Sequence, residues 1–94
     1  MLSIAVCDDE VMECCNIAEK VKEILAELKI SYMIQQFYSG QELMQLPDHF
    51  DIIFLDIIMR DMDGMRTAQM IREKAFDKII IFISSSREFA LEDY

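Results

Sequence analysis

The chain has 94 residues, of which 53% are hydrophobic, and its formal net charge is -9. These values predict one small domain with a packed core and exclude an intrinsically disordered chain. The acidic excess also argues against nucleic-acid binding, because no basic patch is available to contact phosphates.

The apolar segments are short, and the cysteines show no metal-binding spacing. The amino-terminal run ends in acids and lacks a basic leader, so neither a secretory signal nor a membrane span is expected. The chain has three cysteines, Cys7, Cys14 and Cys15, so they cannot all pair with one another. The adjacent residues Cys14 and Cys15 are poorly placed for a disulfide. We therefore expect free thiols, a cytoplasmic location and no membrane partner.

The first half of the chain predicts two strand–helix units. Residues Ser3–Cys7 form a continuous apolar run, which is typical of a strand covered on both faces. Ile30–Tyr38 alternates more and predicts a second strand nearer an edge. Ser39–Glu42 has the capping-box pattern of a short helix that runs through Leu46 and ends at Pro47. Between the two strands, apolar residues at helical spacing predict the inner face of a long helix: Val11, Cys14, Ala18, Val21, Leu25 and Leu28.

The second half continues the alternation. Asp51–Asp56 and Lys78–Ser84 predict the third and fourth strands, and Arg87–Tyr94 predicts the start of a helix. Asp61 or Asp63 is placed to cap a third helix. The predicted inner face of that helix consists of Met65, Ala68, Ile71 and Ala75. Strands that alternate with helices predict an α/β fold with a doubly wound parallel sheet and no internal domain boundary.

Polar side chains stand where three of these strands end. Asp8 and Asp9 follow the first strand, Asp56 ends the third, and Ser84 ends the fourth. In such sheets, functional groups gather at the carboxyl ends of the strands. Clustered carboxylates repel one another unless they share protons or bind a cation, and Mg²⁺ prefers oxygen ligands. An aspartate beside a cation and a hydroxyl predicts a magnesium-assisted aspartyl phosphorylation site.

Five segments resemble the receiver domain of two-component response regulators in order and spacing, over essentially the whole chain. They are Ile4–Glu10, Tyr38–Leu43, Phe54–Ile57, Met62–Gly64 and Ile80–Ser84. The Cys-Asp-Asp-Glu opening and the Ser-Arg-Glu-Phe-Ala-Leu run look most like receivers joined to a LytTR-type DNA-binding domain. The resemblance implies a flavodoxin-like fold with strand order 2-1-3-4.

The resemblance also implies a role for each site residue. Asp56 would accept a phosphoryl group from a phosphohistidine of a sensor histidine kinase, and it would also be a ligand of the magnesium ion. Asp9 would bind magnesium directly, and Asp8 would hold it directly or through water. The backbone carbonyl of Ile58 would be a further ligand, and Ser84 would be the switch hydroxyl. The domain would thus assist its own phosphotransfer and would not be an enzyme acting on a separate substrate.

The chain departs from the family pattern in the loop after the third strand and at its carboxyl end. Arg60 stands where the family has proline, and Gly64 would permit the turn into the third helix. The family's fifth strand, with its lysine and aromatic switch residue, and its fifth helix have no counterpart. We therefore expect residues 1–94 to be a truncated receiver without its output domain. Ile79–Ile83 would then form an exposed apolar edge. We expect two copies of the chain to associate either through this edge or by exchanging structural elements.

A pseudo-receiver and a phosphatase are two alternative functions for this chain. A pseudo-receiver, acting as a protein-interaction module without phosphorylation, is favoured only by the missing lysine. A phosphatase of the haloacid dehalogenase kind needs a second aspartate two residues after the nucleophile, where this chain has Ile58. Met59, Met62 and Met65 lie near the site in sequence and are candidates for lining a partner surface.

Overall fold

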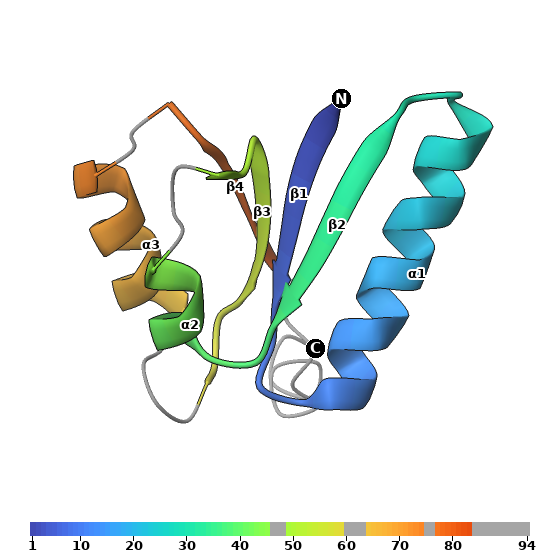
Figure 1. The fold of residues 1–94 in the computed structure, drawn as a ribbon. Coiled ribbons are helices and arrows are strands. Elements are labelled where there is room, and N and C mark those ends of the chain that lie inside the picture. Colours follow the sequence, from blue (N-terminus) through green and yellow to red (C-terminus); the bar gives the residue numbers. More distant parts are fainter. Residues whose placement is uncertain (46–48, 60–63, 75–76, 84–94) are drawn as a thin grey trace, which may run out of the picture.

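The computed structural model describes residues 1–45, 49–59, 64–74 and 77–83, in which strands and helices alternate (Figure 1). The strands are β1 (Leu2–Cys7), β2 (Tyr32–Phe37), β3 (Ile52–Asp56) and β4 (Ile79–Ile83). The helices are α1 (Val11–Glu27), α2 (Gly40–Met44) and α3 (Gly64–Lys74). No helix in the described part of the chain has both the length and the apolar character needed to cross a membrane.

The four strands form one parallel sheet in the order β2-β1-β3-β4. This arrangement confirms the predicted α/β class and the strand order 2-1-3-4, with β2 at an edge. Cys7 is in register with Phe37 on one side and Leu55 on the other. Because neighbouring strands end at nearly the same level, the residues that follow them meet at one edge of the sheet.

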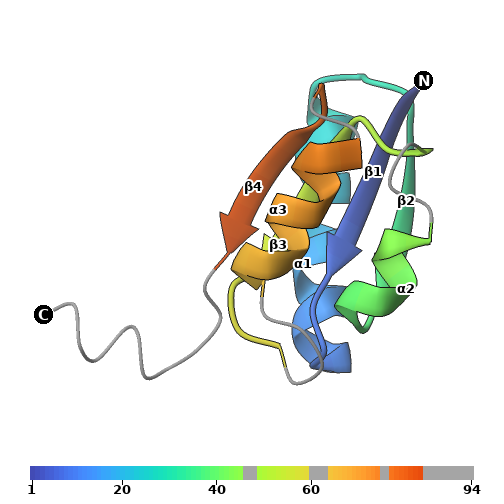
Figure 2. The same ribbon diagram turned by 90° about the vertical axis from the view of Figure 1, so that its left-hand side faces the viewer.

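The sheet is the middle of three layers. Helix α1 covers one face, and α2 and α3 cover the other (Figures 1 and 2). Ile4 and Val6 of β1 pack towards α1, whereas Ala5 and Cys7 belong to the core cluster that includes residues of α2 and α3. All four are at most 1% exposed, which confirms that this apolar run is a strand covered on both faces.

The ends of the predicted helices differ from the structure. Val11 and Leu28 were placed on the inner face of the first helix, but they are 55% and 62% exposed. Met65 was likewise predicted to be inward and is 55% exposed. Helix α2 ends at Met44, two residues before the predicted Leu46.

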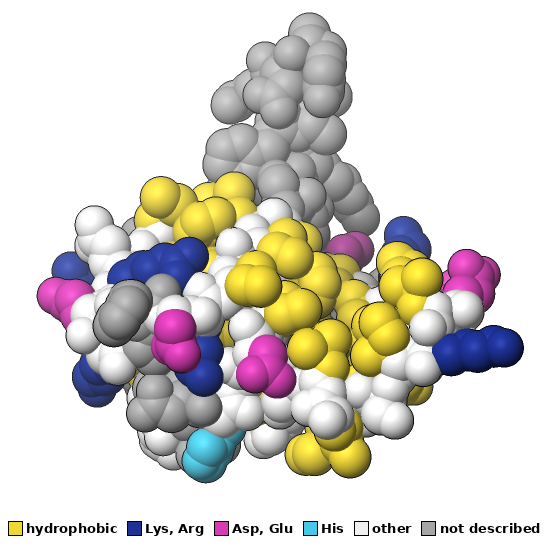
Figure 3. Space-filling model, turned by 90° about the horizontal axis from the view of Figure 1, so that it is seen from above, with side chains coloured by type: hydrophobic (Ala, Val, Ile, Leu, Met, Phe, Trp, Pro, Cys, Tyr) yellow, Lys and Arg dark blue, Asp and Glu magenta, His cyan; other side chains and the backbone are white. Residues whose placement is uncertain are grey.

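Figure 3 views the face at the amino ends of the strands, where hydrophobic side chains gather at the surface.

Candidate functional site

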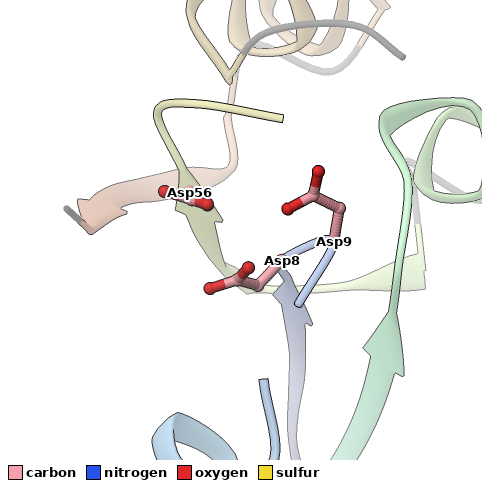
Figure 4. Close-up of side chains that lie close together, drawn as sticks. All are labelled: Asp8, Asp9 and Asp56. Carbon is pink, nitrogen blue, oxygen red and sulfur yellow. The ribbon is translucent and has the colours of Figure 1, made fainter. Parts of the chain in front are cut away.

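Three carboxylates from two neighbouring strand ends converge at the carboxyl edge of the sheet (Figure 4). One oxygen from each of Asp8, Asp9 and Asp56 lies within 4.8 Å of the others. Asp8 follows β1 directly and Asp56 ends β3, and the register of Cys7 with Leu55 brings these two residues side by side. Asp8 is fully buried and Asp56 is 4% exposed, whereas Asp9 is half-buried.

Backbone amides orient the two buried carboxylates. Asp8 Oδ1 accepts a hydrogen bond of 2.9 Å from the Glu10 amide, and Asp56 Oδ1 accepts one of 3.4 Å from the Ile58 amide. Each aspartate therefore caps the turn that leaves its own strand. The amide of Asp8 donates to the Phe37 carbonyl at 3.0 Å, which extends the pairing of β1 with β2 by one residue. Pairing with β2 thus fixes the end of β1 at the point where Asp8 leaves the strand.

Burial makes this cluster electrostatically costly without a cation. Burial raises the pKa of Asp56 to about 6, and the charge of Asp8 adds to this rise. Burial also raises the pKa of Asp8. The hydrogen bond from the Glu10 amide lowers this pKa, and the charge of Asp9 raises it further. A buried ionised carboxylate is unfavourable unless it is paired or bound to a metal. The cluster therefore favours either a proton or a cation at its centre.

The donor set fits a small divalent cation. Carboxylate oxygens are hard ligands, and in an octahedral Mg²⁺ site with bonds of about 2.1 Å, opposite ligands are about 4.2 Å apart. The 4.8 Å limit on the oxygen separations therefore lies within small side-chain adjustments of such a site.

The structure places some of the other predicted site residues and not others. Ile58 is the second residue after the end of β3, and it is 47% exposed. Met59 was a candidate for a partner surface, but it is buried at 6% exposure. Ser84, together with Arg60, Asp61, Met62 and Asp63, lies outside the described residues.

Gly64 contributes to the site in a way that the sequence analysis missed. Its amide donates a hydrogen bond of 2.7 Å to the Ile57 carbonyl. A Cβ atom built on Gly64 would lie 2.0 Å from the backbone oxygen of Asp56. Its φ is not positive, so a close approach, and not a left-handed turn, requires this glycine. The only sequence signal was a glycine that follows the acidic loop and precedes a helical pattern.

A parallel α/β sheet with two buried aspartates at its carboxyl edge is consistent with a divalent-cation site at that edge. A family model described as the response regulator receiver domain matches residues 4–92. The chain belongs to this family.

One curated relative and two solved structures place the chain within this family. The transcriptional regulatory protein YpdB of Escherichia coli K12 is 31% identical over 77% of this chain and 34% of its own length. The chain therefore spans about a third of that relative. The response regulator TrrA of Thermotoga maritima, solved with Mg²⁺-BeF, is 32% identical with a TM-score of 0.71, over 98% of this chain and 76% of that one. The structure of TrrA in complex with the histidine kinase ThkA gives 34% identity and a TM-score of 0.69, over 90% and 70% of the two chains.

Proposed function

We propose that this chain is a phosphoacceptor receiver, in which Asp56 takes a phosphoryl group from a phosphohistidine of a sensor histidine kinase in a magnesium-dependent reaction. The observation that carries the proposal is the convergence of Asp8, Asp9 and Asp56 within 4.8 Å at the end of β1 and β3. Membership of the receiver family supports it. So do the TrrA structures, one of which contains Mg²⁺-BeF and another a histidine kinase.

The acidic cluster and the resemblance to receiver domains together suggest a role for each residue. A carboxylate oxygen of Asp56 attacks the phosphorus, the new O–P bond forms, and the N–P bond of the donor breaks with its electron pair left on the imidazole nitrogen. Asp9, Asp8 and Asp56 would hold the cation, Asp8 directly or through water, with the Ile58 carbonyl as a further ligand. The cation supplies charge neutralisation as the phosphoryl group arrives. Ser84 is assigned the switch hydroxyl that donates to a phosphoryl oxygen.

The ionisation of Asp56 sets a condition on this reaction. The attacking group must be a carboxylate, yet burial and the neighbouring Asp8 raise the pKa of Asp56 to about 6. Asp8 is itself fully buried, so water does little to screen its negative charge from Asp56. A divalent cation offsets both charges and favours the ionised form of Asp56. With a pKa of about 6, Asp56 is already largely ionised at pH 7, and the cation would extend its ionised, reactive form to lower pH.

The output of the receiver is a further part of the proposal. YpdB carries the name of a transcriptional regulatory protein, and this chain covers about a third of it. We assign the chain a DNA-binding output domain of the LytTR type, on the basis of the Cys-Asp-Asp-Glu opening and the Ser-Arg-Glu-Phe-Ala-Leu run. The chain would work in the cytoplasm, where the thiols of Cys7, Cys14 and Cys15, which form no disulfide, stay reduced.

A small-molecule phosphodonor tests the proposal without knowledge of the kinase. The chain is incubated with acetyl phosphate and Mg²⁺, and intact mass spectrometry measures the addition of one phosphoryl group. We expect the adduct with the wild type and its loss with Asp56→Asn or with EDTA. A folded chain that binds no Mg²⁺ and gains no adduct would instead support the phosphorylation-independent pseudo-receiver.

A further inference from the structure

We propose that Gly64 is a positioning residue for Asp56, and that its missing side chain sets the geometry of the cation site. The inference rests on the proposed function and extends it to a residue outside the acidic cluster. Gly64 is buried at the first position of α3, and it faces the backbone that links Asp56 to Ile57.

The backbone after Asp56 is held on two sides. On the sheet side, the Ile57 amide donates to the Ile83 carbonyl of β4 at 3.1 Å. On the helix side, the Ile57 carbonyl accepts the 2.7 Å hydrogen bond from Gly64. The Ile58 amide then donates to Asp56 Oδ1 at 3.4 Å, so this backbone also orients the carboxylate. A shift of this segment would move both Asp56 and the Ile58 carbonyl.

A side chain at position 64 would force such a shift. A Cβ there would meet three backbone atoms, at 2.0 Å from the Asp56 oxygen and 2.8 Å from both the Asp56 carbonyl carbon and the Ile57 Cα. None of these belongs to a flexible side chain that could rotate away, so either α3 or the end of β3 must move. Helix α3 is itself fixed by Thr67, Ala68 and Ile71, which are all buried. The displacement therefore falls partly on residues 56–58.

The cation site has little tolerance for that displacement. Its three carboxylate oxygens lie within 4.8 Å of one another and come from only two strand ends. Groups that orient metal ligands typically change metal affinity by about 10- to 100-fold when they are mutated. Gly64→Ala is therefore expected to weaken Mg²⁺ binding by that factor, because the ligands no longer converge.

The test compares Gly64→Ala with Ala68→Gly, one turn further along the buried face of α3. Ala68→Gly removes a methyl group from the core and loosens the helix, but it adds nothing next to Asp56. For the wild type and both variants, backbone amide NMR follows a Mg²⁺ titration, and urea unfolding gives the stability. In the metal-free proteins, amide shifts caused by Gly64→Ala should be concentrated at residues 56–58.

We expect wild-type Mg²⁺ affinity for Ala68→Gly and a 10- to 100-fold loss for Gly64→Ala. Equal affinity in all three proteins would overturn the positioning role. So would losses in both variants that merely follow their stability. If Gly64→Ala is unfolded, the titration is repeated in trimethylamine N-oxide, which favours the compact state; a chain still unfolded there assigns Gly64 to stability alone and rejects the proposal. A wild type that binds no Mg²⁺ overturns the proposed function and, with it, this inference.

Discussion

The thiol of Cys7 lies 3.6 Å from the thioether sulfur of Met59, and this contact connects the two strand ends that carry the acidic cluster. Cys7 precedes Asp8 on β1, and Met59 follows Ile58 after β3. The same thiol donates to the Ser39 carbonyl at 3.4 Å, at the start of α2. The contact lies on the α2 and α3 side of the sheet, where both residues belong to one core cluster. On this side of the sheet, a contact between two sulfur side chains therefore links the two strand ends.

Shortening Met59 should destabilise the domain and loosen the site. Met59 is 6% exposed, so Met59→Ala leaves a cavity and is expected to lower the free energy of unfolding by about 2–4 kcal/mol. Met59→Leu conserves the volume and should cost less than about 1.5 kcal/mol. Urea unfolding measures both. Equal stability of the two variants would show that packing at this position does not matter.

The buried carboxylates predict that the metal-free domain loses stability as the pH rises. The folded-state pKa of Asp56 is about 6, above the ordinary value of 3.8, so the native state holds this proton more tightly than the unfolded chain. The free energy of unfolding should therefore fall between about pH 4 and pH 6 and remain lower above that range, by about 3 kcal/mol. Urea unfolding in EDTA at several pH values measures this loss.

Asp56→Asn is the matched control for that pH dependence. The amide does not titrate, so the variant should be more stable than the wild type at pH 7 and should show a flatter profile between pH 4 and pH 6. The remaining slope reports the other acids of the chain, including Asp8, whose pKa burial also raises. Parallel profiles for the two proteins would mean that Asp56 ionises without penalty.

The sequence predicted the site better than it predicted the ends of the elements. Asp8 and Asp56 could be placed together because a parallel sheet brings its strand ends to one edge, whatever the details of packing. Val11 and Leu28 were misplaced because a 17-residue helix, about 26 Å long, extends past strands of six residues, about 20 Å long. Helical periodicity continues along the whole helix, but the sheet that would cover its ends does not.

The remaining features depend on contacts between segments far apart in the chain. Met59 is buried because the β1–β3 register brings it to Cys7, and nothing in the local pattern separates it from the exposed Met65. Thr67 is fully buried on α3 although its hydroxyl suggests an outer face. The close approach of Gly64 to Asp56 likewise depends on where α3 packs against β3. Such relations arise from the fold and leave only weak local signals.

Cation binding should reverse the electrostatic penalty and stabilise the fold. At a Mg²⁺ concentration ten times the dissociation constant, binding to the native state adds about 1.4 kcal/mol, which raises the Tm of a domain of this size by about 6–11 °C. Differential scanning calorimetry with and without Mg²⁺ measures the shift.

Asp9→Asn removes one ligand and should abolish most of the shift. Glu23→Gln, which removes the same charge from the exposed face of α1, should retain it. Equal shifts in the two variants would indicate non-specific screening of an acidic protein.

We propose that two copies of the 94-residue chain associate through the β4 edge of the described sheet. In β4, Ile79 is 55% exposed, and Ile81 and Phe82 are each 40% exposed. An exposed apolar edge strand is a template for pairing with another chain, and an edge lysine opposes such pairing. We therefore expect light scattering to show a mass that increases with concentration for the wild type and remains monomeric for Ile81→Lys. Met33→Lys is the matched control, because Met33 is 57% exposed on β2 at the opposite edge. A wild type that stays monomeric at high concentration would reject association through β4, and dissociation by Met33→Lys alone would assign it to the β2 edge.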